Sequence, residues 1–279
     1  MNELAPAKLN LCLYLGPLRE DGKHELVSVM QSLELADRLT LSDHSAPADE
    51  VRCPGVAGPN LAARAIAAFR ELTGWDGPPQ LLEIDKRIPV AAGLGGGSAD
   101  AAAALRLLAR RSALGSDEQL HEIAVALGAD VPSQLHPGRW LARGAGERLT
   151  PLADAGPVGL LVLPSHTTLS TAAVYAEADR LGLSRSAEEL ATLLETLDPA
   201  DPEPVNDLAT AALSLEPTIA AALQQALDAG AEHAMVCGSG PTVVGVFPTL
   251  HHAEAACREL NQSGVNAKAS SALHNSLSR

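Results

Sequence analysis

Aromatic side chains are scarce in this sequence: Phe, Trp and Tyr together make up 2% of its 279 residues. So few rings are unlike the stacking platforms that bind single-stranded nucleic acid. Positive charge is also short, since the formal net charge is -14 at pH 7, and a nucleic-acid or anionic-membrane surface needs a basic face. We therefore expect no nucleic-acid or membrane partner, and any anionic ligand must be held by backbone amides and a few placed cations.

Cysteine is sparse too. The four cysteines are Cys12, Cys53, Cys237 and Cys257. They form no CxxC pair, which argues against a zinc site and a dense disulfide framework. The opening MNELAPAKLNLCLYL is unlike a signal peptide because Glu3 and Lys8 interrupt it, and no apolar run approaches the roughly 18 residues of a membrane span. These absences predict a cytoplasmic protein, and they leave open whether it is a monomer or a homodimer.

Glycine, in contrast, is concentrated in one stretch. PVAAGLGGGSADAAAALRLLARR begins at Pro89, and four glycines occupy the five positions from Gly93 to Gly97. Two interpretations are open: a flexible hinge before a core helix, or a loop whose amides close around phosphate at a helix N-terminus. Phosphate binding explains the entropic cost of the glycines better, because no Cβ blocks the approach and the first-turn amides can meet the anion.

Three common glycine motifs do not fit this chain. Its Gly-Lys pair is followed by histidine, so the Walker A pattern GxxxxGK[ST] fails. The dinucleotide fingerprint GxGxxG fails because its third glycine falls on Ser98 or Asp100. The nucleophile elbow GxSxG fails because Cys237 stands two residues before Ser239.

Turn and cap residues divide the chain into strands mixed with helices. Asn60 is a natural N-cap and Gly74 a natural helix stop. We expect strands at about 8–15, 26–41, 80–88, 140–152, 158–164, 234–248 and 265–273, and helices at about 60–74, 98–115, 117–128, 171–182, 186–197, 217–229 and 251–260. This mixture indicates an α+β fold with two domains, 1–152 and 153–279, joined by a linker at 150–159.

Two charged residues outside the glycine stretch lie at positions that the local sequence pattern defines. Alternation in KLNLCLYL places Lys8 and Asn10 on the face opposite the leucines, although an edge-strand lysine facing solvent is an open alternative. Asp130 follows a helix that Gly128 ends, and it could equally be a turn-forming aspartate.

These motifs resemble those of the GHMP kinases, the small-molecule kinases named after galactokinase, homoserine kinase, mevalonate kinase and phosphomevalonate kinase. The glycine-rich stretch is similar to their second motif and VCGSGPTVVGVF to their third. APAKLNLCLYL, DGKHELVSVMQSLELAD, NLAARA, DKRIPVAAGLGGGSADAA and LGADVPSQL resemble, in order, the branch that phosphorylates a cytidine-diphosphate-linked methylerythritol in non-mevalonate isoprenoid precursor synthesis. The resemblance implies an N-terminal mixed sheet-helix domain, a C-terminal ferredoxin-like α+β domain and an active site in the cleft between them.

The resemblance also implies the chemistry and the residues of the site. It implies transfer of the γ-phosphoryl group of ATP to a tertiary hydroxyl, with Mg²⁺ present and Lys8 and Asp130 as the catalytic pair. Asn10 would orient the substrate or Asp130. The implied ATP-binding residues are Pro89, Val90, Ala91, Ala92, Gly93, Leu94, Gly95, Gly96, Gly97, Ser98 and Ala99, with Asn60 and Lys86 near the adenine. The implied substrate-binding residues are Asn10, Lys23, His24, Ser239 and Thr242.

Several of these residues also have a plain structural interpretation. Ser98 is expected to be the N-cap of its helix as well as a ligand of phosphate or Mg²⁺. Asp100 is expected to be a first-turn partner of the helix dipole rather than a metal ligand. His24 could be an exposed loop histidine, and Ser239 and Thr242 could simply form a turn.

One position departs from the family pattern. The residue before His24 is usually an aromatic that stacks on cytosine, and here it is Lys23. Lysine cannot stack as a ring does, and the chain has few aromatics to substitute. Two alternatives stay open: a GHMP-type kinase for another small alcohol such as homoserine, and a nucleotide-binding protein without catalysis. GADVP and DGKHEL argue against the first, and the presence of both Lys8 and Asp130 argues against the second.

Overall fold

The computed structural model describes residues 1–56, 58–154, 156 and 158–273, and the chain divides into two compact units. The first unit comprises Met1–Ala7, Leu35–Val90 and Gly95–Pro137; the second comprises Lys8–Glu34, Ala91–Leu94 and the chain from Gly138 onward. Two long strands, β1 (Asn2–Leu18) and β2 (His24–Asp43), pair with each other and contribute residues to both units. The mixture of strands and helices confirms the predicted α+β class.

The domain boundary between residues 152 and 153 stays a prediction. Residues 155 and 157 of the predicted linker lie outside the described residues.

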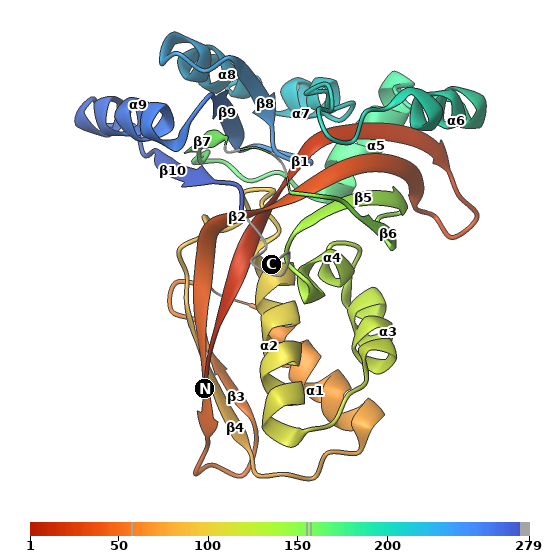
Figure 1. Cartoon of the computed structure of the whole chain (residues 1–279), viewed down its shortest axis with the longest axis vertical. Helices are drawn as coiled ribbons and strands as arrows, with labels where there is room; N and C mark the ends of the chain where they lie inside the picture. The colour runs from red at the N-terminus through yellow and green to blue at the C-terminus, as the bar shows by residue number, and fades with distance from the viewer. Residues whose placement is uncertain (57, 155, 157, 274–279) are drawn as a thin grey trace. The chain divides into compact units, whose positions relative to one another are not determined.

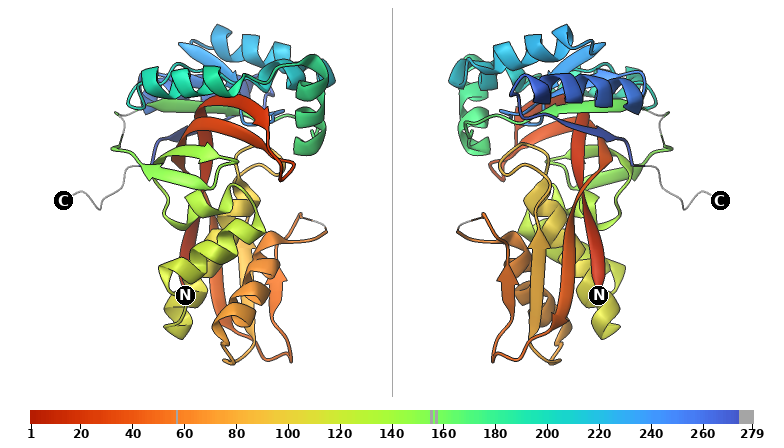
Figure 2. Two further views of the ribbon diagram at one scale, coloured as in Figure 1. Left: turned by 90° about the vertical axis from the view of Figure 1, so that its right-hand side faces the viewer. Right: turned by 90° about the vertical axis from the view of Figure 1, so that its left-hand side faces the viewer.

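The first unit packs four helices on strands. Its further elements are β3 (Glu50–Arg52), α1 (Leu61–Thr73), β4 (Gln80–Asp85), α2 (Gly96–Ser112), α3 (Asp117–Leu127) and α4 (Val131–Leu135). β4 pairs antiparallel with the Arg38–Asp43 end of β2 and parallel with β3. The helices cover one face of these strands, with α2 in contact with α1, α3 and α4 (Figures 1 and 2).

Different features of the sequence define the two central helices of this unit. The α1 helix is set by its caps: the Asn60 side chain accepts a 2.8 Å hydrogen bond from Ala62 N, and Gly74 adopts the left-handed conformation that ends it, as predicted. The α2 helix is instead alanine-rich and buried over most of its circumference. Small side chains let it approach its neighbours closely, so this helix is positioned by packing on several sides.

The second unit contains a four-stranded antiparallel sheet in the order β10-β7-β9-β8. Its further elements are β5 (Arg139–Gly144), β6 (Arg148–Pro151), β7 (Gly159–Leu163), α5 (Thr171–Leu181), α6 (Ala187–Thr196), α7 (Ala209–Leu215), α8 (Ile219–Asp228), β8 (His233–Val236), β9 (Val243–Phe247), α9 (Leu250–Gln262) and β10 (Lys268–Ser271). With strands numbered along the chain, this order is four-one-three-two, which is the predicted ferredoxin-like arrangement. The helices α8 and α9 pack on the sheet (Figure 1).

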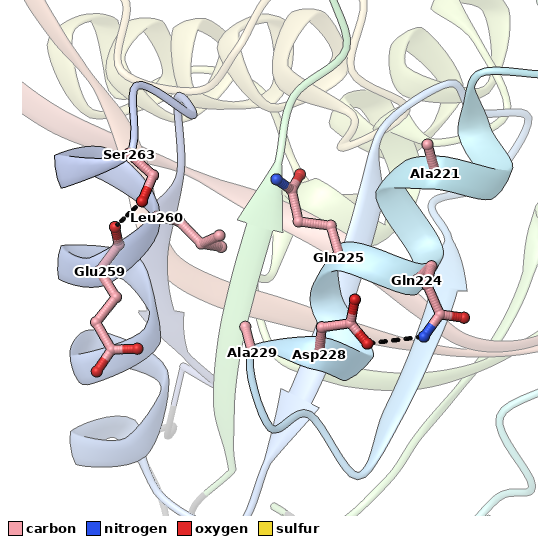
Figure 3. Close-up of a pocket in the computed structure, with 8 residues that line it drawn as sticks. All are labelled: Ala221, Gln224, Gln225, Asp228, Ala229, Glu259, Leu260 and Ser263. Carbon is pink, nitrogen blue, oxygen red and sulfur yellow. Dashed lines mark hydrogen bonds between the residues drawn. The ribbon is translucent and has the colours of Figure 1, made fainter.

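A hollow of about 480 Å³ lies between α8 and α9 (Figure 3). Its lining includes Gln224, Gln225, Asp228 and Glu259, and Gln224 donates a 2.8 Å hydrogen bond to Asp228. The residues that line it are different from all those that the sequence predicts for the site.

Candidate active site

The glycine-rich loop departs from ordinary backbone geometry at three positions. Ala91, Gly93 and Gly95 have φ values of 55°, 70° and 69°, in the left-handed region that side chains with a Cβ rarely adopt. Gly93 is required for a second reason, because a Cβ there would lie 2.3 Å from the carbonyl oxygen of Cys237. The loop is thus fitted closely to the turn after β8, which is unlike a flexible hinge.

The helix α2 starts directly from this loop, at Gly96. The first bond of its ladder runs from Ala99 N to Gly95 O at 2.8 Å, so the amides before Ala99 have no helical carbonyl to bind. A Cβ added at Gly97 would meet no described atom within 4 Å. These features leave room for an anion at the helix N-terminus.

The expected role of Ser98 as N-cap is wrong. The N-cap is Gly95, which makes no side-chain cap bond, and Ser98 is the third residue of the helix. The glycines themselves are helical at Gly96 and Gly97, because bare backbone in a first turn is free to follow either geometry. The role of Ser98 as a ligand of phosphate or Mg²⁺ stays a prediction.

A buried ionic cluster lies next to the start of α2. Lys86 donates to Asp100 Oδ2 at 2.8 Å and also to Asp37 Oδ2. The second oxygen of Asp37 accepts the backbone N–H groups of Arg87 and Ile88, at 2.5 and 2.8 Å. The Lys86 ammonium would lie 3.2 Å from a Cβ at Gly96, so the cluster fastens the end of β2 and the segment after β4 to the first turns of α2.

Burial sets the electrostatics of this cluster. Asp37 and Asp100 are 0% and 3% exposed, and two carboxylates share one lysine. Burial raises the pKa of Asp100 to about 7, although Lys86 opposes that rise. Burial also lowers the pKa of Lys86, but its pairing with Asp100 and Asp37 outweighs this and leaves that pKa raised.

Two expectations change in view of this cluster. Asp100 is not a first-turn partner of the helix dipole, because α2 begins earlier than predicted and Asp100 becomes its fifth residue. The Lys86 ammonium is engaged by carboxylates, so its predicted place near adenine stays a prediction. Asp37 was missed, since nothing in the sequence indicates that it reaches Lys86.

Lys8 is buried on β1, in the second unit, and is not the solvated edge lysine that the sequence left open. Its ammonium donates to Asn10 Oδ1 at 2.7 Å, and the Asn10 amide donates in turn to Ser28 Oγ at 2.7 Å. The Ser28 hydroxyl donates a hydrogen bond to the carbonyl oxygen of Cys12 at 2.6 Å. Because the Cys12 carbonyl oxygen can only accept, the direction of each hydrogen bond from Lys8 to Cys12 is fixed. Asn10 therefore orients Lys8, and its predicted role toward the substrate or Asp130 stays a prediction.

The third glycine motif forms the turn between β8 and β9. Cys237 N donates to Thr242 O at 2.9 Å, and Gly240 N donates to Cys237 O at 2.7 Å. A Cβ on Gly238 would lie 3.8 Å from Lys8 Nζ and 3.7 Å from Asn10 Oδ1. The turn thus forms a wall beside the Lys8 ammonium.

The two predicted substrate residues of this turn differ in accessibility. Thr242 is buried, at 1% exposure. Ser239 is partly exposed, and its hydroxyl lies 3.1 Å from that of Thr171.

The Leu94 carbonyl of the glycine-rich loop accepts a 2.9 Å bond from Lys8 N. Loop, turn and β1 therefore meet within the second unit.

Asp130 lies in the first unit, between α3 and α4. It stands at the N-cap position of α4, but its carboxylate makes no cap bond. Its backbone carbonyl accepts a 2.9 Å bond from Ser133 Oγ. The side chain is partly exposed, so the carboxylate is not used to start the helix that follows it.

His24 is buried rather than exposed, at 5%. Its Nδ1 lies 2.9 Å from Gly16 O, and its Nε2 lies 3.1 Å from Asp179 Oδ1 without the geometry of a hydrogen bond. The ring of Tyr175 lies beside it, with centroids 5.5 Å apart. The neighbouring Lys23 is exposed. The sequence offers few aromatics that could substitute at this place, and α5 brings one of them, Tyr175, there from far along the chain.

The described residues contain no group of three or more His, Cys, Asp or Glu side chains able to hold a metal ion. All four cysteines are free. Mg²⁺ is usually held by one or two protein oxygens together with substrate phosphates. The Ser98 hydroxyl in the first turn of α2 is the predicted protein oxygen, whereas Asp100 Oδ1 is buried without a hydrogen-bond partner among the described residues.

Comparison with known proteins gives a consistent family. Residues 60–138 match the family "GHMP kinases N terminal domain", and residues 182–266 match "GHMP kinases C terminal". The chain is 43% identical over 259 residues to the 4-diphosphocytidyl-2-C-methyl-D-erythritol kinase of Anaeromyxobacter dehalogenans (strain 2CP-C), covering 88% of this chain and 80% of that one. It is 41% identical over 276 residues to the enzyme of the same name from Nocardia farcinica (strain IFM 10152), covering 94% and 89%.

A solved structure agrees with these relatives. The crystal structure of a 4-(cytidine 5'-diphospho)-2C-methyl-D-erythritol kinase matches with a TM-score of 0.80 and 34% identity, over 97% of this chain and 98% of that one. Within the part of the chain that the structure describes, no helix combines the length and the apolar character needed to cross a bilayer.

Proposed function

The chain belongs to the 4-diphosphocytidyl-2-C-methyl-D-erythritol kinase family of GHMP kinases, and we propose on this basis how its residues carry out the reaction. It catalyses ATP-dependent phosphorylation of 4-diphosphocytidyl-2-C-methyl-D-erythritol, a step in isoprenoid precursor synthesis. The acceptor is the 2-hydroxyl of the methylerythritol moiety. ATP supplies the γ-phosphoryl group.

The observation that carries the proposal is the start of α2. A helix that begins on bare glycine, with no side-chain cap and open space at Gly97, presents backbone donors that an anionic group can use. A Cβ at Gly97 would occupy that space. With a net charge of -14, the chain needs such local donors to hold a polyphosphate.

Lys8 and Asp130 take the chemical roles. Asp130, whose carboxylate is not used as a helix cap, accepts the proton of the substrate hydroxyl. Lys8 places an ammonium, held in one direction by Asn10, where negative charge develops during transfer. Because phosphoryl transfer depends mainly on positioning and charge stabilisation, a buried and oriented lysine suits it better than a mobile surface lysine.

The cytidine end of the substrate is assigned to His24 and Tyr175. Since Gly16 O can only accept, His24 Nδ1 carries a hydrogen, while Nε2 is buried 3.1 Å from the Asp179 carboxylate. The family pattern assigns His24 to the edge of cytosine, whose exocyclic amino group uracil replaces with a carbonyl. Tyr175 supplies a ring for the base face, and the exposed Lys23 is left to contact the diphosphate.

Mg²⁺ is part of the proposal through Ser98, whose hydroxyl could bind an ion shared with the phosphates. Ser239 and the backbone around Thr242 support the diphosphate of the substrate. Asn60 and Lys86 lie at the ends of secondary-structure elements and contribute to the adenine side. These assignments follow the family pattern residue by residue.

A phosphorylation assay with a panel of alcohols tests the proposal. The purified chain is incubated with ATP and Mg²⁺ and, in turn, the cytidine-diphosphate substrate, its uridine counterpart, homoserine and mevalonate. We expect turnover with the cytidine compound and a clear loss with the uridine compound. Turnover with homoserine or mevalonate alone would indicate a different small-alcohol kinase. Tight ATP binding without turnover on any alcohol would indicate a non-catalytic protein.

A further inference from the structure

Asn206 lies just before α7 and binds the backbone of the third glycine motif through its side chain. Its amide nitrogen donates two hydrogen bonds, to Val236 O at 2.8 Å and to Gly238 O at 2.7 Å. Its amide oxygen accepts the N–H of Leu208 at 3.0 Å. All three bonds go to backbone atoms, so the orientation of the amide is fixed at both ends.

The backbone around Asn206 is also attached to β1. Leu13 N donates to Val205 O at 2.7 Å, and Asp207 N donates to Leu13 O at 2.9 Å, which forms a short parallel bridge between Leu13 and Asn206. The carboxylate of Asp207 accepts Leu15 N at 2.9 Å and pairs with Arg185. Asn206 is therefore anchored on the same strand that carries Lys8 and Asn10.

This arrangement links two parts of the proposed site. The turn that Asn206 holds includes Gly238, where a Cβ would lie 3.8 Å from Lys8 Nζ. The amide of Asn206 thus connects the strand that carries the ammonium to the backbone that faces it. A side chain needs two N–H donors to satisfy the carbonyl oxygens of both Val236 and Gly238. An aspartate in the same place would offer them a carboxylate oxygen, which cannot donate.

We propose that Asn206 is a positioning residue for phosphoryl transfer, which fixes the turn from Val236 to Gly238 against Lys8. It acts through that turn and does not itself need to touch the substrate. The inference rests on the proposed function, because it assumes that Lys8 takes part in the transfer. A shift of the turn by a fraction of an ångström would then weaken catalysis more than it weakens ATP binding.

The chain provides a matched control at Asn261, in α9. Its amide nitrogen donates to Ala267 O at 3.1 Å and to Cys257 Sγ at 3.2 Å, and its oxygen accepts Ala267 N at 3.0 Å. Asn261 therefore makes the same kind of three-way bracket in the same unit, between α9 and the segment that leads to β10. Its substitution removes equivalent bonds without touching the glycine turn.

The test compares Asn206→Ala and Asn206→Asp with Asn261→Ala and Asn261→Asp. For each variant, kcat, the KM of the alcohol substrate, the Kd of ATP and the Tm are measured, with kinetics well below the Tm. We expect kcat to fall about 10- to 100-fold in the Asn206 variants while the Kd of ATP changes by less than about threefold. The Asn261 variants should lose a comparable amount of Tm and keep kcat within about twofold.

Two outcomes would overturn the inference. If Asn206→Ala retains kcat, or if both pairs of variants lose activity only in proportion to their loss of folded protein, Asn206 is merely structural. Measuring the unsubstituted chain distinguishes failure of the positioning role from failure of the proposed function. Absence of phosphoryl transfer there overturns both, whereas normal transfer there with an unaffected Asn206→Ala overturns the positioning role alone.

Discussion

Asp130 offers a direct test of the proposed base. Asp130→Asn keeps the size of the side chain but removes its ability to accept a proton, so we expect kcat to fall by roughly 10²- to 10⁴-fold. The Kd of ATP should change little, because this carboxylate is assigned to the hydroxyl. Steady-state kinetics measures the change in kcat, and calorimetric titration measures the Kd of ATP. Asp117→Asn, at the exposed start of α3, is the control, and near-normal turnover in Asp130→Asn would reduce Asp130 to a turn residue.

The buried Asp100 predicts a pH dependence of stability. Burial raises its folded-state pKa to about 7 from the ordinary value of 3.8, so between these values the native chain holds a proton that the unfolded chain has lost. This contribution to stability is complete below the unfolded pKa and is lost as pH rises through the folded pKa. The free energy of unfolding of the unsubstituted chain should therefore fall relative to Asp100→Asn between about pH 4 and about pH 7, by up to about 1.4 kcal/mol per pH unit.

Denaturant unfolding of both proteins at several pH values measures this difference. The exposed Asp85, which pairs with Arg87, provides the control substitution Asp85→Asn, for which we expect no such trend. A difference between the unsubstituted chain and Asp100→Asn that stays flat with pH would show that Asp100 is ionised throughout this range.

Single residues were predictable where a local pattern defined them. Alternation placed Lys8 and Asn10 on one face, and the structure joins them at 2.7 Å. Ser28 and Asp37 were missed because their partners lie 18 and 49 residues away in sequence, and no spacing rule reports a contact at that distance. Tyr175 was missed for the same reason.

At the scale of elements, α2 and its glycines make a sharp prediction. Gly97 is helical and its added Cβ would meet no described atom within 4 Å, so Gly97→Ala should stabilise the fold or leave it unchanged, since Ala exceeds Gly in helix propensity by up to about 1 kcal/mol. The same methyl group would occupy the space proposed for phosphate. We therefore expect a weaker affinity for ATP without a lower Tm.

Adenosine is the matched control ligand, because it lacks the phosphates. Its affinity for Gly97→Ala should equal that for the unsubstituted chain, while the Kd of ATP rises. If ATP binds both proteins equally well, the open space at Gly97 is not where phosphate lies, and the start of α2 loses its proposed role.

Elements were predictable in proportion to their length and their caps. The ends of α1 follow from Asn60 and Gly74, and the strand pair around the third glycine motif was expected from its turn. In contrast, β3, α4 and α7 have only three, five and seven residues, too few for a period to be recognised. The sequence predicts the start of α2 two residues late, because clustered glycines favour a loop, whereas Gly96 and Gly97 are helical.

At the scale of the whole molecule, the path of the chain is what the sequence could not reveal. The linker candidate at 150–159 predicts a boundary between residues 152 and 153, whereas the compact units are built from interleaved segments of the chain: Lys8–Glu34 groups with the chain from Gly138 onward. Leu13 and Leu15 of β1 lie in one hydrophobic cluster with Leu161 and Leu163 of β7. A linear boundary would therefore cut through the core of the second unit.

The final prediction follows from that threading. A fragment of residues 153–279 lacks β1, and its cluster loses Leu13 and Leu15, which are 4% and 0% exposed. Truncating even one such side chain, as in Leu15→Ala of the full chain, typically costs about 2–5 kcal/mol, a large part of the stability of an ordinary domain. We expect the fragment to show no cooperative thermal transition by circular dichroism, and a peptide of residues 8–34 to restore one when added in trans. A peptide of residues 58–84, from the other unit, should have no effect. Cooperative unfolding of the fragment alone would instead make residue 152 a true folding boundary, with β1 an accessory to a sheet that is already stable.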